Sequence, residues 1–193
     1  MQRLDVLAVG LWTTLGCTVF ATGAAATTRV LTYNVEHPTY GIIGTYTNAI
    51  SENQDFTEVR SALHVAVKVI GIPLYRQEAA REERWQRHRL VGFQSATDDN
   101  GTAISVRGHA EGDHFVIQSS SNGTLTAPAR VYPSNPWSPF LLQSGTLMST
   151  KTGRLHSAVV KDGGDVNVTL DGRPMRVHQW FVDDEKHQVV WID

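Results

Sequence analysis

Apolar and polar residues alternate along most of the chain after residue 26, a pattern typical of half-buried β-strands. Leu31, Tyr33 and Val35 fall on one face of the first such segment, with polar residues between them. The alternation returns in the segments 56–70, 165–170 and 175–182. Turn residues recur about every 8–12 positions, as they do in all-β sandwiches and barrels. The pattern predicts an all-β fold: an antiparallel half-barrel or barrel-like sheet of about 10–12 strands.

Residues 77–85 conflict with this pattern, because they are mostly strong helix formers. They lack an apolar stripe at helical spacing, and only Ala79, Ala80 and Trp85 are able to pack against a core. Trp85 shares a face with Tyr75 at the two-residue period of a strand. We therefore predict a charged, solvent-facing strand here, with a helix as the alternative.

The stretch from Pro128 to Gly145 contains four prolines interleaved with aromatic residues, so it is not a central strand. We expect a long crossover that caps one end of the sheet. Residues 134–137 open with Ser-Asn-Pro and are suited to one short helical turn.

Residues 1–26 are typical of an export signal. A weakly basic start precedes an apolar run over residues 6–20, and small residues at 23–26 favour cleavage before Thr27. A transmembrane anchor and a lipidated Cys17 are the alternatives, but polar residues dilute the run and apolar residues continue past the cysteine. We expect a periplasmic or secreted protein, with residues 27–193 forming one β domain.

The printed sequence ends at residues 189–193 within an apparent strand. No closing turn or polar tail follows it. We expect the domain to lack its last strand, the alternative being that residues 189–193 form the edge of the sheet.

Composition narrows the classes of function. The 193 residues carry 17 Lys and Arg against 19 Asp and Glu, a net charge of −2, which argues against a nucleic-acid binder. The hydrophobic fraction of 41% is enough for one full core. Cys17 is the single cysteine, so signal cleavage leaves no thiol for disulfides, cysteine-bound metals or thiol catalysis.

Few residues form a recognisable chemical motif. His109, Asp113 and His114 flank one turn and provide ligands for a weak metal site, but exposed turn histidines explain them better. Asp98 and Asp99 precede Asn-Gly, which a hairpin turn explains better than calcium binding. We predict no metal and no cofactor. Asp98, Asp99 and His109 remain the acid and base candidates of a hydrolase without a sequence signature.

Aromatic residues provide the candidate binding site. Tyr33, Tyr46, Trp85 and Trp180 are placed to line a barrel interior. Aromatic-lined concave sheets commonly hold small apolar ligands, although ordinary core packing explains any one of these residues.

Several short motifs resemble one family of proteins. They are Gly71-Ile72-Pro73 followed by Tyr75, a charged strand ending at Trp85, Thr97-Asp98-Asp99-Asn100-Gly101 and Asn135-Pro136-Trp137. Together they resemble an uncharacterised family of exported proteobacterial β-rich proteins, a domain of unknown function. The resemblance implies a periplasmic antiparallel half-barrel without an established activity. It also implies a further strand after Trp191.

Three hypotheses for function follow. The first is a non-catalytic periplasmic protein that binds a hydrophobic or amphipathic ligand on a concave sheet. The second is a structural or accessory envelope protein that joins a partner through its sheet edges. The third is the unmarked hydrolase. Whether the sheet encloses a cavity or packs solid separates the first hypothesis from the others.

Overall fold

The structure of the protein is a computed structural model that describes residues 9–10, 27–135, 137–143, 145–170, 172–183 and 188–192. Of these residues, 78% lie in strands and none in an α-helix. The strands form two sheets, of nine and five strands, and neither closes into a barrel. The prediction of an all-β fold with a large antiparallel sheet is confirmed. The sequence pattern alone did not reveal the division into two sheets.

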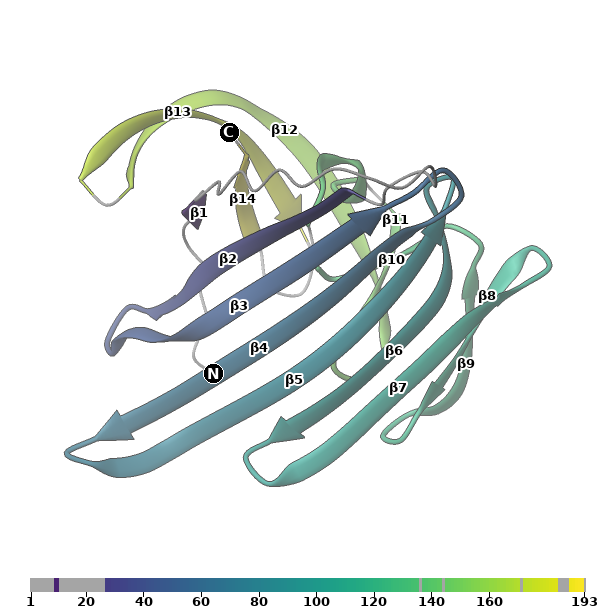
Figure 1. Cartoon of the computed structure of the whole chain (residues 1–193), viewed down its shortest axis with the longest axis horizontal. Coiled ribbons are helices and arrows are strands. Elements are labelled where there is room, and N and C mark those ends of the chain that lie inside the picture. Colours follow the sequence, from purple (N-terminus) through teal and green to yellow (C-terminus); the bar gives the residue numbers. More distant parts are fainter. Residues whose placement is uncertain are drawn as a thin grey trace, which may run out of the picture.

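The first sheet is a curved meander in which each strand pairs antiparallel with the next (Figure 1). Tight turns join most of its strands, and at Asn100 and Gly101 both φ angles are positive, as a two-residue hairpin turn requires. Its strands are β1 (Val9–Gly10), β2 (Thr27–His37), β3 (Gly41–Glu52), β4 (Thr57–Val69), β5 (Ile72–Gln86), β6 (Arg89–Asp99), β7 (Thr102–Glu111), β8 (His114–Ser119) and β9 (Gly123–Pro128).

The second sheet follows after the proline-rich crossover. It begins with a parallel pair, β10 and β11, because the short 3₁₀ helix η1 (Pro139–Leu141) and its flanking loops return the chain to the same direction. The remaining pairs are antiparallel. Its strands are β10 (Val131–Pro133), β11 (Gly145–Met148), β12 (Leu155–Leu170), β13 (Arg173–Asp183) and β14 (Gln188–Ile192).

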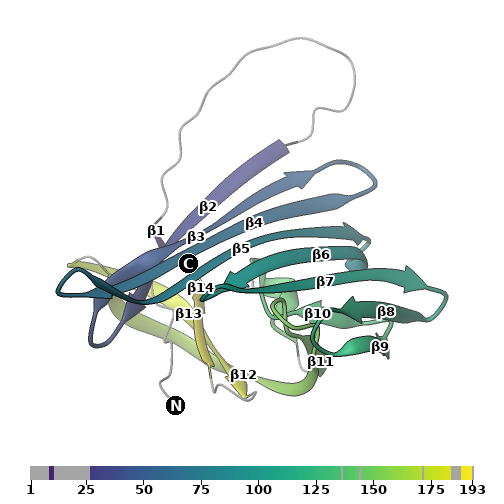
Figure 2. The same ribbon diagram turned by 90° about the horizontal axis from the view of Figure 1, so that it is seen from below.

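The main core lies between the two sheets. Figure 2 shows the second sheet running along one face of the curved first sheet. Trp85 of β5 is buried against three aromatic residues of the crossover, Tyr132, Trp137 and Phe140, with ring centroids 5.4–6.4 Å apart. Edge-to-face contacts predominate in this cluster, which is the favoured geometry for aromatic pairs. The crossover therefore packs on the face of the first sheet.

The prediction of a strand over residues 77–85 is confirmed, but its description as solvent-facing is wrong for one face. Glu78, Glu82 and Arg84 of β5 point to solvent, whereas Arg81 and Glu83 are buried. Alternation explains the difference, because Arg81 and Glu83 share a face with the buried Trp85.

The buried face of the β12–β13 pair changes from one side to the other at a bulge. Gly163 is an extra residue between Asp162 and Gly164, where the register of the pair shifts. Val177 is buried on one side of this bulge and Val182 on the other, although they differ in parity along β13. A bulge bends and twists a strand pair, so the two parts of the hairpin bury opposite faces.

Most of the predicted export signal falls outside the described residues. Within it, Val9 and Gly10 form β1 and pair with Tyr33 and Thr32 of β2. The described part of the chain contains no helix of the length and apolar character needed to cross a membrane.

Candidate functional site

A buried carboxylate lies at the centre of the contact between sheet and crossover. The Glu83 residue is 2% exposed and stands on the covered face of β5, between Arg81 and Trp85. Because the side chains of a strand alternate, Trp85 and Glu83 are buried together, while the neighbouring Glu82 points to solvent. A buried carboxylate is costly unless hydrogen bonds or charges compensate for the lost water.

Three N–H groups donate to the Glu83 carboxylate. The indole Nε1 of Trp85 and that of Trp137 each lie 2.9 Å from Oε2, and Nδ2 of Asn135 lies 3.0 Å from Oε1. Trp85 belongs to β5 itself, whereas Asn135 and Trp137 belong to the crossover. The carboxylate thus joins two segments that are more than fifty residues apart in sequence.

The hydrogen-bond network continues across β3 and β4. The hydroxyl of Ser61 donates to Oδ1 of Asn48 over 2.6 Å, and both residues are buried. Nδ2 of Asn135 lies 3.3 Å from the Ser61 hydroxyl oxygen and 3.5 Å from Asn48 Oδ1. Asn48, Ser61 and Arg81 are directly paired neighbours across the sheet, so one row of polar side chains receives the crossover.

Arg81 provides positive charge beside Glu83. Its Nη1 donates to the hydroxyl of Tyr46 over 3.3 Å, and its guanidinium carbon Cζ lies over the Tyr46 ring, 5.6 Å from the centroid. Burial raises the pKa of Tyr46, although the positive charge of Arg81 opposes that shift. Tyr46 therefore remains a neutral hydroxyl at physiological pH.

Burial raises the pKa of Glu83, because loss of water disfavours its charged form. The hydrogen bonds from Asn135, Trp137 and Trp85 oppose this shift, as does the charge of Arg81. All three neighbours donate, so the oxygens of Glu83 act as acceptors for fixed groups. The arrangement is suited to anchoring the crossover, because both Glu83 oxygens already accept hydrogen bonds from protein groups and the carboxylate is closed to solvent.

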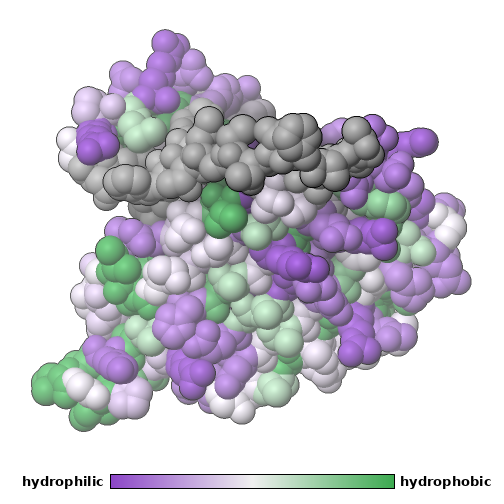
Figure 3. All heavy atoms as spheres, in the orientation of Figure 1, coloured by the Kyte–Doolittle hydropathy of each residue, from purple (hydrophilic) through white to green (hydrophobic). Residues whose placement is uncertain are grey.

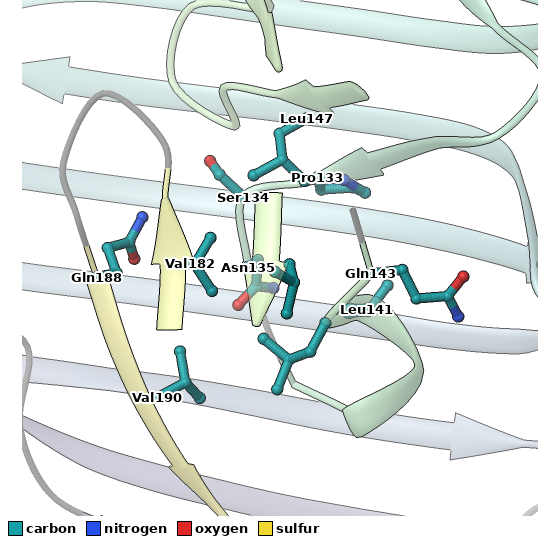
Figure 4. A pocket seen from close by; sticks show the side chains of 11 residues that line it. Pro133, Ser134, Asn135, Leu141, Gln143, Leu147, Val182, Gln188 and Val190 are labelled. Atoms are coloured by element: carbon teal, nitrogen blue, oxygen red, sulfur yellow. The ribbon is translucent and has the colours of Figure 1, made fainter. Parts of the chain in front are cut away.

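A small crevice adjoins this network on the side of the second sheet (Figure 4). Its enclosed volume is about 30 Å³, room for about one water molecule. The lining is mostly aliphatic and comes from the crossover, β11, β12, β13 and β14. Asn135 lines it as well, and Oδ1 of this 3% exposed residue has no hydrogen-bond partner among the described residues.

The four predicted ligand-binding aromatics lie on three strands of the first sheet and one of the second, and Trp180 packs against the core cluster that contains Trp85. Tyr33 and Tyr46 stack at 6.2 Å between ring centroids, both half-buried. Trp85 is 2% exposed within the core and takes part in the Glu83 network. Trp180 lies on β13 of the second sheet, 5.1 Å from the His178 ring. Their role in ligand binding stays a prediction.

The three hydrolase candidates do not meet. Asp99 accepts from the Tyr75 hydroxyl over 2.5 Å and forms an ion pair with Lys151. Burial disfavours ionisation of Asp99, but hydrogen bonds from Lys151 and Tyr75 outweigh it and lower the pKa. Asp98 of β6 pairs with Ala103 of β7, and Ala103 lies six residues before His109 on the same strand. Asp98 and His109 are therefore about 20 Å apart along the strand direction.

The histidines at the β7–β8 turn pair with separate carboxylates. His109 Nε2 lies 3.7 Å from Glu111 Oε2, and His114 Nδ1 lies 3.2 Å from Asp113 Oδ1. Within the described ranges, no group of three or more His, Cys, Asp or Glu side chains is arranged to hold a metal ion.

A charged group on β12 and β13 surrounds His178. Its Nδ1 lies 2.8 Å from Asp165 and its Nε2 lies 2.8 Å from Asp162, while Arg176 binds Asp165 as well. The hydrogen bond with Asp165 raises the pKa of His178. All four side chains are open to solvent to a large degree, so the group is a surface ion network.

Comparison with protein-family models decides the family of this chain. Residues 41–193 match a domain of unknown function, DUF6134. The protein belongs to this family. The DUF6134 range contains Glu83, its three donors and the crossover, so the whole network lies within the family domain. Comparison with curated proteins and with solved structures found no match.

The expected membership of an uncharacterised family is confirmed by the DUF6134 match. Its exported, proteobacterial origin stays a prediction. Sequence reasoning missed Glu83 and Asn135 as a connected pair. One signal was present for Glu83: it lies two residues before Trp85, on the face that Trp85 shares with Tyr75 at the two-residue period of a strand.

Proposed function

We propose that this DUF6134 protein is an exported accessory protein of the cell envelope that acts through apolar surface, rather than through a ligand held inside its sheets. The observation that carries the proposal is the position of its exposed apolar side chains. Six of the ten large hydrophobic residues that are exposed in the described chain lie at one end of the first sheet. We call this group the hairpin end: Tyr40, Ile42, Val69, Ile70, Ile72 and Leu74.

The packed interior supports the same proposal. Where the crossover and the second sheet meet, the crevice beside Asn135 has room for about one water molecule, and the larger hollow over β7–β9 is polar and open to solvent. Sites for small molecules are usually clefts of about 300–1,000 Å³. Exposed apolar side chains that gather at one end of a molecule are typical of a surface that binds another structure.

A second apolar surface lies near the last strand of the second sheet. Phe181 and Val189 are both 42% exposed and directly paired across β13 and β14, and Val159 on β12 is 50% exposed. Among the described strands, β14 pairs with β13 alone. An edge strand beside an apolar face favours pairing with another chain, as expected for an accessory protein.

The proposal predicts where the protein resides in the cell that makes it. After osmotic lysis, most of the full-length gene product is expected to sediment with the envelope, because its exposed apolar groups are held there. The double variant Ile70→Asn/Phe181→Ser is expected to move to the soluble fraction. Quantitative immunoblotting of both fractions measures this. A wild-type protein found wholly in the soluble fraction, or in the cytoplasm, contradicts the proposal.

The second candidate is a binding protein for a small amphipathic molecule, and Asn135 favours it. An unpaired, buried acceptor beside aliphatic side chains suits a ligand with one N–H or O–H donor and an apolar body. Such a ligand has to displace the crevice walls, because the enclosed space is small.

Native mass spectrometry of the protein purified from its own cells tests this candidate. A bound mass that is lost in Leu147→Trp, which fills the crevice, supports it, with Leu125→Trp on β9 as the matched control away from the crevice. A ligand-free wild-type protein rules it out.

A further inference from the structure

We propose that the hairpin end docks on the surface of a lipid bilayer and that Ile70, at the tip of the β4–β5 hairpin, enters its apolar layer. This inference rests on the proposed function and names the structure to which the hairpin end binds. Figure 3 shows hydrophobic surface gathered on the projecting tip at the lower left of the molecule.

The tip projects beyond the neighbouring turn. Ile72, the first residue of β5, lies five residues before Gln77, which pairs with Asp99 at the end of β6. At the rise of a strand this is a projection of about 17 Å. The β2–β3 turn lies on the other side, and Figure 1 shows both tips at the same end of the sheet. Tyr40 and Ile42 therefore flank the projecting tip, and the acidic β6–β7 turn is set back from it.

The conformation of Ile70 is unfavourable for the folded chain alone. Its φ is 51°, followed by 78° at Gly71, so both turn residues are left-handed. Asparagine and glycine suit this turn, whereas a β-branched residue there is a steric outlier. Ile70 is also 96% exposed, so packing within the described chain does not compensate. Contact with a structure outside the molecule would bury the Ile70 side chain, which packing within the described chain does not do.

Charge around the tip suits an anionic lipid surface. Residues 67–77 contain Lys68 and Arg76 and no acidic residue, and both basic side chains are exposed. Arg76 also contacts Glu78 at 3.4 Å, on the exposed face of β5. Basic residues beside an apolar insertion increase binding to membranes with negative headgroups.

Flotation with vesicles tests the inference. The probes are vesicles of equal parts phosphatidylcholine and phosphatidylglycerol, and vesicles of phosphatidylcholine alone, mixed with protein recovered after export. We expect wild-type protein to float with the mixed vesicles. The variant Ile70→Asn is expected to lower the partition constant about tenfold, the effect of removing one buried aliphatic side chain. Lys68→Gln is expected to weaken binding to the mixed vesicles only.

Ile70→Asn is also its own folding control. Asn-Gly is the preferred sequence for this turn, so the variant is expected to melt at or above the wild-type temperature. Val30→Thr removes an exposed aliphatic side chain on β2, outside the hairpin end, and is expected to leave flotation unchanged. Every variant has the same N-terminus, so the comparison isolates the tip.

Equal binding of the wild-type protein and Ile70→Asn overturns the inference, as does absence of wild-type binding to both kinds of vesicle. If the protein sediments with the envelope in cells yet binds neither kind of vesicle, the envelope proposal stands and the occupant is a protein partner. If it is soluble in cells as well, both proposals fail.

Discussion

The variant Glu83→Leu is expected to unfold with a free energy about 3–5 kcal/mol lower than that of the wild-type protein. The substitution removes the acceptor of three buried N–H groups, those of Trp85, Asn135 and Trp137. The two indole N–H groups then stay buried without a partner, which costs about 1–3 kcal/mol per group before the structure relaxes, whereas Nδ2 of Asn135 keeps its contacts with Ser61 and Asn48. Urea denaturation followed by tryptophan fluorescence measures the loss.

Glu82→Leu is the matched control for this experiment. Glu82 is the next residue of the same strand, but it points to solvent and contacts Arg60 and Gln94 on the surface. Its replacement is expected to change the free energy of unfolding by about 0.5 kcal/mol or less. Equal effects of the two substitutions would contradict the assignment of Glu83 as the anchor of the crossover.

Trp85→Ala is expected to lower the free energy of unfolding by about 3–5 kcal/mol. The indole is 2% exposed and contacts three aromatic rings of the crossover, so its removal leaves a large cavity. Trp85→Phe keeps most of the packing and removes only the N–H donor to Glu83. Its cost is expected to be about 1.5–3 kcal/mol, the range for a hydrogen bond to a charged group.

Trp191→Phe provides the comparison for that smaller change. Its indole donates to the amide oxygen of Gln179 over 2.8 Å on the partly exposed second sheet. A loss of about 0.5–1.5 kcal/mol is expected for this neutral hydrogen bond. If Trp85→Phe were no more costly than Trp191→Phe in chemical denaturation, the buried carboxylate would not be a strong acceptor.

Local sequence pattern was sufficient to predict the strands. Period-2 alternation identified the segment with Leu31, Tyr33 and Val35, of which Val35 is buried, and the Asn100-Gly101 turn has the positive φ angles that its composition predicts. In residues 77–85 alternation competed with helix propensity, and pairing with β4 and β6 decided in favour of a strand. The same alternation, applied to every odd position, places Glu83 beside Trp85 in the core.

Other features depend on contacts that no local pattern contains. Glu83 meets Asn135 and Trp137 across more than fifty residues, and which crossover residue reaches the sheet is decided by tertiary packing. The bulge at Gly163 also changes which residues of β13 are buried, so a single alternation does not describe that strand. Trp180 reaches the core from the second sheet, where it packs against the cluster that contains Trp85, and no local pattern indicates this contact.

The central structural claim is that one buried carboxylate joins the crossover to the first sheet. Burial raises the pKa of Glu83 above its ordinary value of 4.5. A carboxyl group with a raised pKa in the folded protein contributes stability below pH 4.5, and this contribution is lost as the pH rises through the folded-state pKa. In Glu83→Gln this part of the pH dependence is expected to disappear.

The most direct test follows the indole Nε1–H resonances of Trp85 and Trp137 by NMR as the pH is varied. Both protons donate to Oε2 of Glu83, so they are expected to exchange slowly with solvent and to shift together. Their common midpoint should lie above pH 4.5, and both shifts should vanish in Glu83→Gln. Rapid exchange of either proton, or two unrelated titrations, would contradict the claim that a single carboxylate holds the crossover in place.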